Sequence, residues 1–185
     1  MRAFYGVFVL AAFLSLPLAA GPIEYIESGQ LSGTLGSTVL TNAAFSFTFF
    51  GDTANITGTN PILNPALSNV ITIAGSPGAF TTAVEVGDSN AASVVGFSDL
   101  SLNNGITLVN AAAATYNLAT AIGPLTAVTE FDLNASTLGT TLGTLTITSA
   151  TNLSFQAVPT PEPATVGLAA LALLGMAVAG RRKLF

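Results

Sequence analysis

The chain has 185 residues, with nine acidic and four basic side chains, no histidine and no cysteine. Without these two residue types it has no Ser-His-Asp triad, no thiol redox chemistry and none of the usual zinc ligand sets. The long middle part of the chain carries acids and no base, which excludes a cationic surface for binding nucleic acid. The basic residues all lie near the two ends, and they are Arg2, Arg181, Arg182 and Lys183.

Residues 1–20 have the composition of a secretory signal peptide. Arg2 supplies the positive charge, residues 4–16 form the apolar segment, and the small residues Ala19 and Ala20 suit cleavage after Ala20. An uncleaved N-terminal anchor is the alternative. We therefore expect signal peptidase to remove this segment and the following residues to be exported.

The body, residues 21–158, contains short β-prone segments separated by Gly, Pro, Asn and Asp. In residues 45–49 phenylalanine alternates with small polar residues, which predicts a strand with an aromatic inner face that ends at residues 50–52. Residues 90–122 are less regular, and the Ala-rich residues 110–116 predict a short helix or a single helical turn. The further predicted strands are 35–40, 70–73, 80–86, 125–133, 142–147 and 153–157.

Many short strands in a body of this size predict a single all-β domain over residues 21–158, an antiparallel β-sandwich. A closed sheet is the alternative architecture. Residues 159–163 follow as a proline-rich linker, which we expect to be extended and to hold the domain off the segment that comes next.

Two turns in the body combine acids, amides and hydroxyls. Asp52 and Asn55 lie in the first of these turns, and Asp88 and Asn90 lie in the second. Calcium prefers six to eight oxygen ligands of this kind, so these four residues are candidate metal ligands and calcium is the candidate cofactor. The alternative is an ordinary β-turn, because Asp and Asn side chains also bond the local backbone.

Glu130 and Asp132 are two residues apart on a predicted strand and therefore share one of its faces. Glycosidases use paired carboxylates as acid and base, but those carboxylates flank a sugar and usually come from different strands. We expect a solvated strand face here, no catalytic site in the chain, and a protein that is not an enzyme.

The C-terminal part begins with proline and ends with positive charge. Residues 164–180 contain no charged side chain, and as a helix they are about 25 Å long, close to the lower limit for crossing the apolar core of a bilayer. Pro161 and Pro163 stop this helix from running back into the body. Residues 181–185 begin with Arg181, Arg182 and Lys183, which favour the cytoplasmic side. The sequence predicts a transmembrane helix over 164–180 and a basic cytoplasmic tail over 181–185.

This tail resembles the PEP-CTERM sorting signal of Gram-negative bacteria. The resemblance covers about 25 residues and rests on three features together: the motif Pro161-Glu162-Pro163, the hydrophobic helix after it, and the basic residues 181–183. It implies that an exosortase, a membrane protease, recognises the tail and cuts near the motif. The chain would then be a substrate of sorting rather than a sorting enzyme.

Taken together, these features predict an exported protein with a structural or interaction role. It is expected to span the inner membrane as a precursor and then to reside at the cell surface or in the extracellular matrix, where extracellular polysaccharide is the candidate partner. One alternative is a calcium- or glycan-binding adhesion module, and another is a single-span membrane protein that is never cleaved. A hydrolase that uses Glu130 and Asp132 is the third.

Overall fold

The computed structural model describes residues 20–100, 104–127, 129–133, 137–160 and 172. The predicted signal peptide and transmembrane helix, the motif Pro161-Glu162-Pro163 and the basic residues 181–183 lie outside these ranges. No helix within the described ranges has the length and apolar character needed to cross a membrane. The described body is all-β, and its strands pair in antiparallel fashion in two sheets.

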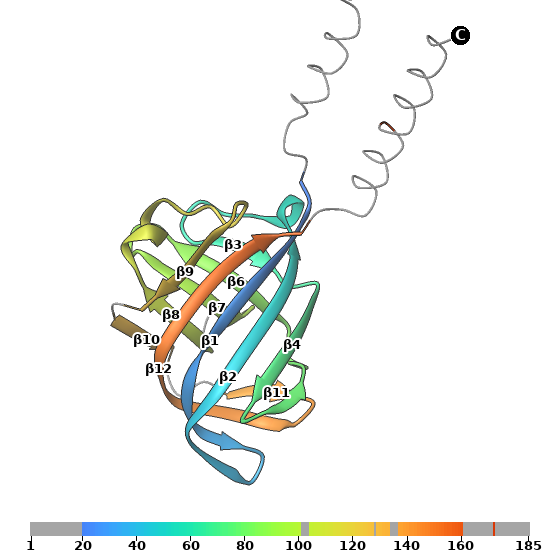
Figure 1. Ribbon diagram of the computed structural model, residues 1–185, viewed down its shortest axis with the longest axis vertical. Helices are drawn as coiled ribbons and strands as arrows, with labels where there is room; N and C mark the ends of the chain where they lie inside the picture. Colours follow the sequence, from blue (N-terminus) through green and yellow to red (C-terminus); the bar gives the residue numbers. More distant parts are fainter. Residues whose placement is uncertain (1–19, 101–103, 128, 134–136, 161–171, 173–185) are drawn as a thin grey trace, which may run out of the picture.

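The larger sheet has seven strands, arranged in the order β11-β12-β1-β2-β4-β5, with β9 pairing separately with β12. Its centre consists of three long strands that run side by side, β12, β1 and β2 (Figure 1). The strands are β1 (Pro22–Leu35), β2 (Thr38–Asp52), β4 (Ser68–Ile73), β5 (Ser76–Gly78), β9 (Ile122–Thr126), β11 (Thr137–Thr140) and β12 (Gly143–Pro159).

The smaller sheet has five strands in the order β10-β8-β7-β6-β3. Two short 3₁₀ helices, η1 (Thr53–Asn55) and η2 (Ala111–Thr115), lie in the connections. The strands of this sheet are β3 (Ile62–Pro65), β6 (Val84–Ser89), β7 (Val94–Asp99), β8 (Gly105–Val109) and β10 (Thr129–Leu133).

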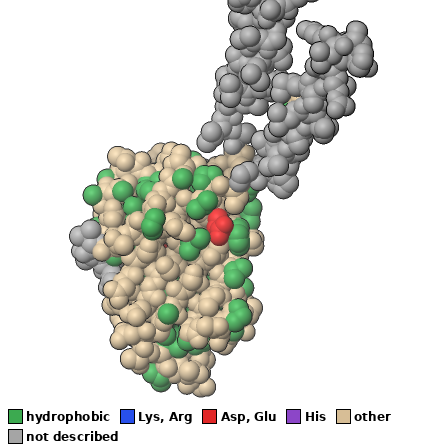
Figure 2. Space-filling model, viewed as in Figure 1, with side chains coloured by type: hydrophobic (Ala, Val, Ile, Leu, Met, Phe, Trp, Pro, Cys, Tyr) green, Lys and Arg blue, Asp and Glu red, His purple; other side chains and the backbone are tan. Residues whose placement is uncertain are grey.

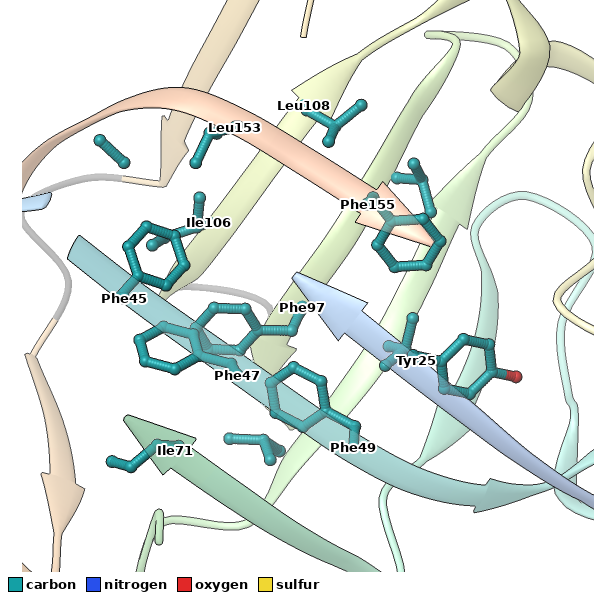
Figure 3. Packing of buried hydrophobic residues seen from close by; sticks show 14 of the residues in the cluster. Tyr25, Phe45, Phe47, Phe49, Ile71, Phe97, Ile106, Leu108, Leu153 and Phe155 are labelled. Carbon is teal, nitrogen blue, oxygen red and sulfur yellow. The ribbon is translucent and has the colours of Figure 1, made fainter. Parts of the chain in front are cut away.

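A cluster of phenylalanines joins the two sheets (Figure 3). Phe47 and Phe49 are almost completely buried on one face of β2, because side chains of alternate residues share a face of a strand. Phe97 of β7 packs against both, with its ring centre 5.4 Å from that of Phe47 and 5.1 Å from that of Phe49. Phe80 completes the cluster, 5.3 Å from Phe97. The core therefore lies between the two sheets.

The structure confirms the elements that the most regular sequence patterns predict. The prediction of a strand at residues 45–49, with an aromatic inner face, is confirmed within β2, and the strand at 70–73 is confirmed as part of β4. The prediction at 110–116 is confirmed as η2, whose N-cap Asn110 accepts a hydrogen bond from the Ala112 backbone. The local sequence was sufficient at these places, because the residues of each element themselves show its alternation or its helical composition.

Other boundaries were wrong. The strand predicted at residues 35–40 is interrupted by the β1–β2 hairpin turn at residues 36–37, where Gly36 adopts φ of +58°, so Leu35 ends β1 and residues 38–40 begin β2. The segment predicted at 125–133 as one strand supplies two, β9 and β10, which belong to different sheets. The segments predicted at 142–147 and 153–157 as two strands are one, β12. The strand predicted at 80–86 begins only at Val84.

Candidate functional site

Both ends of the described body meet at one corner of the larger sheet (Figure 1). The Gly21 backbone NH donates to Thr53 Oγ1 at 2.8 Å, and the Thr53 NH donates to the Gly21 carbonyl at 3.0 Å. The Thr160 NH donates to the Pro22 carbonyl at 2.9 Å. Backbone hydrogen bonds thus hold the chain up to Thr160, the residue before Pro161, where the predicted sorting motif starts.

The first candidate calcium turn lies at this same corner. Asp52 caps η1, because its Oδ1 accepts a hydrogen bond from the Ala54 NH at 2.8 Å, and Asn55 at the end of η1 is exposed. This is the local backbone bond that an ordinary turn makes with an Asp side chain. Calcium binding by Asp52 and Asn55 stays a prediction.

The second candidate calcium turn is part of a partly buried contact. Asn90 Nδ2 donates to Asp88 Oδ2 at 2.7 Å and also contacts the Ala113 carbonyl at 2.9 Å and the Tyr116 carbonyl at 2.8 Å. The amide nitrogen of Asn90, rather than its oxygen, therefore faces the carboxylate, and the contact fixes η2 against β6. Burial raises the pKa of the Asp88 carboxyl to about 7.

Asp88 and Asn90 are in contact with each other, whereas Asp52 and Asn55 lie in a separate turn. Among the residues that the structure describes, no three acidic side chains are grouped so that they would hold a metal ion. Ligation by Asp88 and Asn90 would require the amide of Asn90 to turn over, with the loss of three contacts. It too stays a prediction.

A second buried polar contact was not foreseen from the sequence. Asn64 Nδ2 donates to the Tyr25 hydroxyl at 2.7 Å, and that hydroxyl donates to the Leu118 carbonyl at 2.6 Å. Burial is the main cause that raises the pKa of Tyr25 to about 12. The contact ties β3 and the segment after η2 to β1, and no local sequence signal reveals it because its members are far apart in the chain.

Glu27 is an acidic residue whose side chain is fully buried in the core. It lies on β1 between Phe47 of β2 and Phe155 of β12, which are its partners in the strand register, and its side chain has no exposed surface. Neither carboxyl oxygen is in hydrogen-bonding geometry with any described residue. Burial raises the pKa of this carboxyl well above its ordinary value. The nearby Phe97 backbone opposes only part of that shift, and it does so from outside hydrogen-bonding geometry.

The paired acids Glu130 and Asp132 lie on β10, at the edge of the smaller sheet. In the strand register they stand opposite Leu108 and Ile106 of β8. Their side chains are outside the described part of the structure. Their solvated role and the absence of catalysis stay predictions.

The outer face of the larger sheet carries a row of hydroxyl groups. Neighbouring positions in the register across β9, β12, β1, β2 and β4 place a hydroxyl residue on each of the five strands, in the order Thr126, Ser154, Ser28, Ser46 and Thr72. Adjacent members are one strand apart, about 4.8 Å. Figure 2 shows this face with an acidic side chain among hydrophobic side chains, and with backbone and uncharged polar atoms over the rest.

Comparison with known proteins gives a match for the tail and none for the body. A family model described as the PEP-CTERM protein-sorting motif matches residues 159–183. No curated protein and no solved structure matches the chain significantly. The match begins at Pro159, the last residue of β12, so it starts where the folded body ends. The chain thus carries a PEP-CTERM protein-sorting motif in its tail, which marks it as an exported, cell-surface protein that an exosortase processes.

Proposed function

We propose that this chain is a structural or interaction protein of the cell surface or extracellular matrix, without catalytic activity. Its two packed sheets would form a β-sandwich scaffold. Signal peptidase would remove residues 1–20, and residues 164–180 would hold the precursor in the inner membrane with residues 181–183 inside. The exosortase would then cut near Pro161-Glu162-Pro163 and release the body. The observation that carries this proposal is the sorting motif at residues 159–183.

The position of the motif supports this route. Backbone bonds hold the chain up to Thr160, so a cut at residues 161–163 would leave β12 and its pairing with β1 intact. The fate of the acids supports a role without catalysis. Asp52 caps a helix, Asp88 bonds Asn90, and Glu27 is sealed in the core, where no substrate reaches it.

Replacing the three motif residues by alanine, Pro161→Ala, Glu162→Ala and Pro163→Ala together, is expected to block sorting. In a host that has the exosortase, the original chain should appear in the surface or matrix fraction, and the triple variant should remain in the inner membrane at precursor length. The matched control is Pro77→Ala, an exposed proline of β5, which should be sorted like the original chain. Normal surface delivery of the triple variant would contradict the proposal.

Glycan binding is the second candidate function, and the hydroxyl row on the larger sheet favours it. Hydroxyl groups in a regular array can exchange hydrogen bonds with the hydroxyls of a neutral polysaccharide, and the described residues include no basic side chain that would select a charged one. Retention of the protein on an immobilised neutral glucan, unchanged by a calcium chelator, would support this function. Retention that the chelator abolishes would instead support the calcium-dependent alternative.

A further inference from the structure

Four large hydrophobic side chains are exposed together at the corner from which the tail leaves. Val158 of β12 and Phe50 of β2 stand on either side of Glu24 in the strand register, and they are 45% and 37% exposed. Val70 of β4 lies two residues beyond the position opposite Phe50, and Leu67 donates its backbone NH to the Phe50 carbonyl at 2.8 Å. We call these four hydrophobic residues the tail-side patch.

The tail-side patch is not explained by the packing of the body. Val158, Phe50 and Val70 belong to the outer face of the larger sheet, because cross-strand partners point to the same side. The inner face of the same strands is already filled by the phenylalanine core. Scattered exposed hydrophobic residues are normal, but a group of them on one part of a surface marks a binding site. In the described part of the chain, two other large hydrophobic residues are exposed, Val39 and Leu100.

The length of chain after the patch limits where the patch can be in the precursor. Ala164, the first residue of the apolar segment, comes six positions after Val158, and six fully extended residues span at most about 20 Å. When that segment is in the membrane, as the proposed function has it, Val158 is within this reach of the apolar core of the bilayer, and the rest of the patch lies on the neighbouring strands.

We propose that the tail-side patch docks on the lipid surface of the membrane that holds the tail. The patch offers Val, Leu and Phe side chains, with the carboxyl of Glu24 between Val158 and Phe50 in the register. Since the described residues include no positive charge, the contact is apolar apart from this carboxyl and does not select anionic headgroups. Its small size also fits lipid better than a protein partner, because specific protein interfaces bury about 800 Å² on each partner.

Attachment of the tail makes such a weak contact effective. A short tether keeps the body at a local concentration in the millimolar range, which allows four side chains to stay docked although they would not hold a free protein. Cutting the tail removes this advantage. The body would therefore lie on the membrane as a precursor, with residues 161–163 at the surface where a membrane protease works, and would leave after cleavage.

The chain contains no cysteine, so one introduced thiol carries one fluorescent label. Full-length protein with a label at Val70→Cys is reconstituted in phosphatidylcholine vesicles that contain lipids with a nitroxide quencher in the headgroup. The matched control carries the label at Val39→Cys, an exposed valine of β2 at the hairpin end of the same sheet. A third protein carries it at Leu171→Cys in the tail.

Docking predicts several-fold stronger quenching at residue 70 than at residue 39, and a decrease when Phe50→Ser and Val158→Ser are added to the Val70→Cys protein. Equal quenching at residues 70 and 39, with the label at residue 171 shielded from water, would overturn the docking inference and leave the membrane-held precursor intact. A label at residue 171 that stays in water would instead show that the tail does not hold the precursor in the membrane, and would contradict the proposed function. If the label at residue 70 becomes shielded from water only after exosortase is added, the patch binds the enzyme rather than lipid, and lipid docking is overturned.

Discussion

Replacing Glu27 by methionine is expected to stabilise the folded body. Methionine has the same unbranched length as glutamate and suits a position that opposes Phe47 and Phe155. The change removes a fully buried carboxyl whose two oxygens lack hydrogen bonds to the described residues. An unsatisfied buried polar group costs about 1–3 kcal/mol, so the free energy of unfolding at pH 5 should rise by a similar amount.

The gain from Glu27→Met should grow as the pH rises. The pKa of Glu27 is raised in the folded state above its ordinary value of 4.5, so the folded protein binds this proton more tightly than the unfolded chain does. Its contribution to stability is complete below pH 4.5 and is lost as the pH rises through the folded pKa. Urea unfolding of the original and variant proteins from pH 4 to pH 9 measures the difference.

The matched control is Glu27→Gln, which keeps the shape and a polar end but cannot ionise. The free energy of unfolding of this variant should lack the decrease with pH that Glu27 causes, and at low pH it should stay close to that of the original protein. Asp88, whose pKa is raised to about 7, should leave a smaller decrease of stability with pH in all three proteins. A Glu27→Met protein that is less stable than the original at every pH would show that the carboxyl has a partner in the core.

Replacing Phe47 by alanine is expected to destabilise the body by about 3–5 kcal/mol, as large-to-small changes of buried aromatic residues do. Phe47 has no exposed surface and its ring contacts those of Phe45, Phe80 and Phe97, so the alanine leaves a cavity where the two sheets meet. The midpoint of urea unfolding should fall steeply while the slope stays the same.

Phe50→Ala is the control for this change. Phe50 lies on the same strand as Phe47 but on the outer face of the sheet, where it is 37% exposed. Its replacement should cost about 1 kcal/mol or less, as surface changes usually do. Similar losses for the two variants would mean that the faces of β2 are assigned the wrong way round.

The sequence predicted β2 from its alternating phenylalanines but missed β1, because Glu27 occupies an inward position and interrupts the hydrophobic alternation of Ile23 and Tyr25. It also missed β7, in which four successive residues are buried, so that the strand shows no period of two. These strands are buried by pairing with distant parts of the chain, which a local pattern does not contain.

The tail was predictable from a local sequence pattern, whereas the rest of the candidate site depends on contacts between residues far apart in the chain. The sorting motif was predicted in full because its proline, apolar and basic parts are contiguous in residues 159–183. The contacts of Asn64 with Tyr25, and of Asn90 with Ala113 and Tyr116, join residues from 23 to 39 positions apart. The role of Asn90 as a donor to η2 therefore emerged only when the fold placed η2 beside β6.

The intact mass of the protein, measured in a native-type host with and without its exosortase, tests the sorting of this chain most directly. With the enzyme, the account predicts a mature chain that lacks residues 1–20 and ends near residues 161–163. Without the enzyme, it predicts a chain that still carries Arg181, Arg182 and Lys183. A mass that retains these three residues in both strains would mean that the tail is a permanent anchor, and would contradict the account.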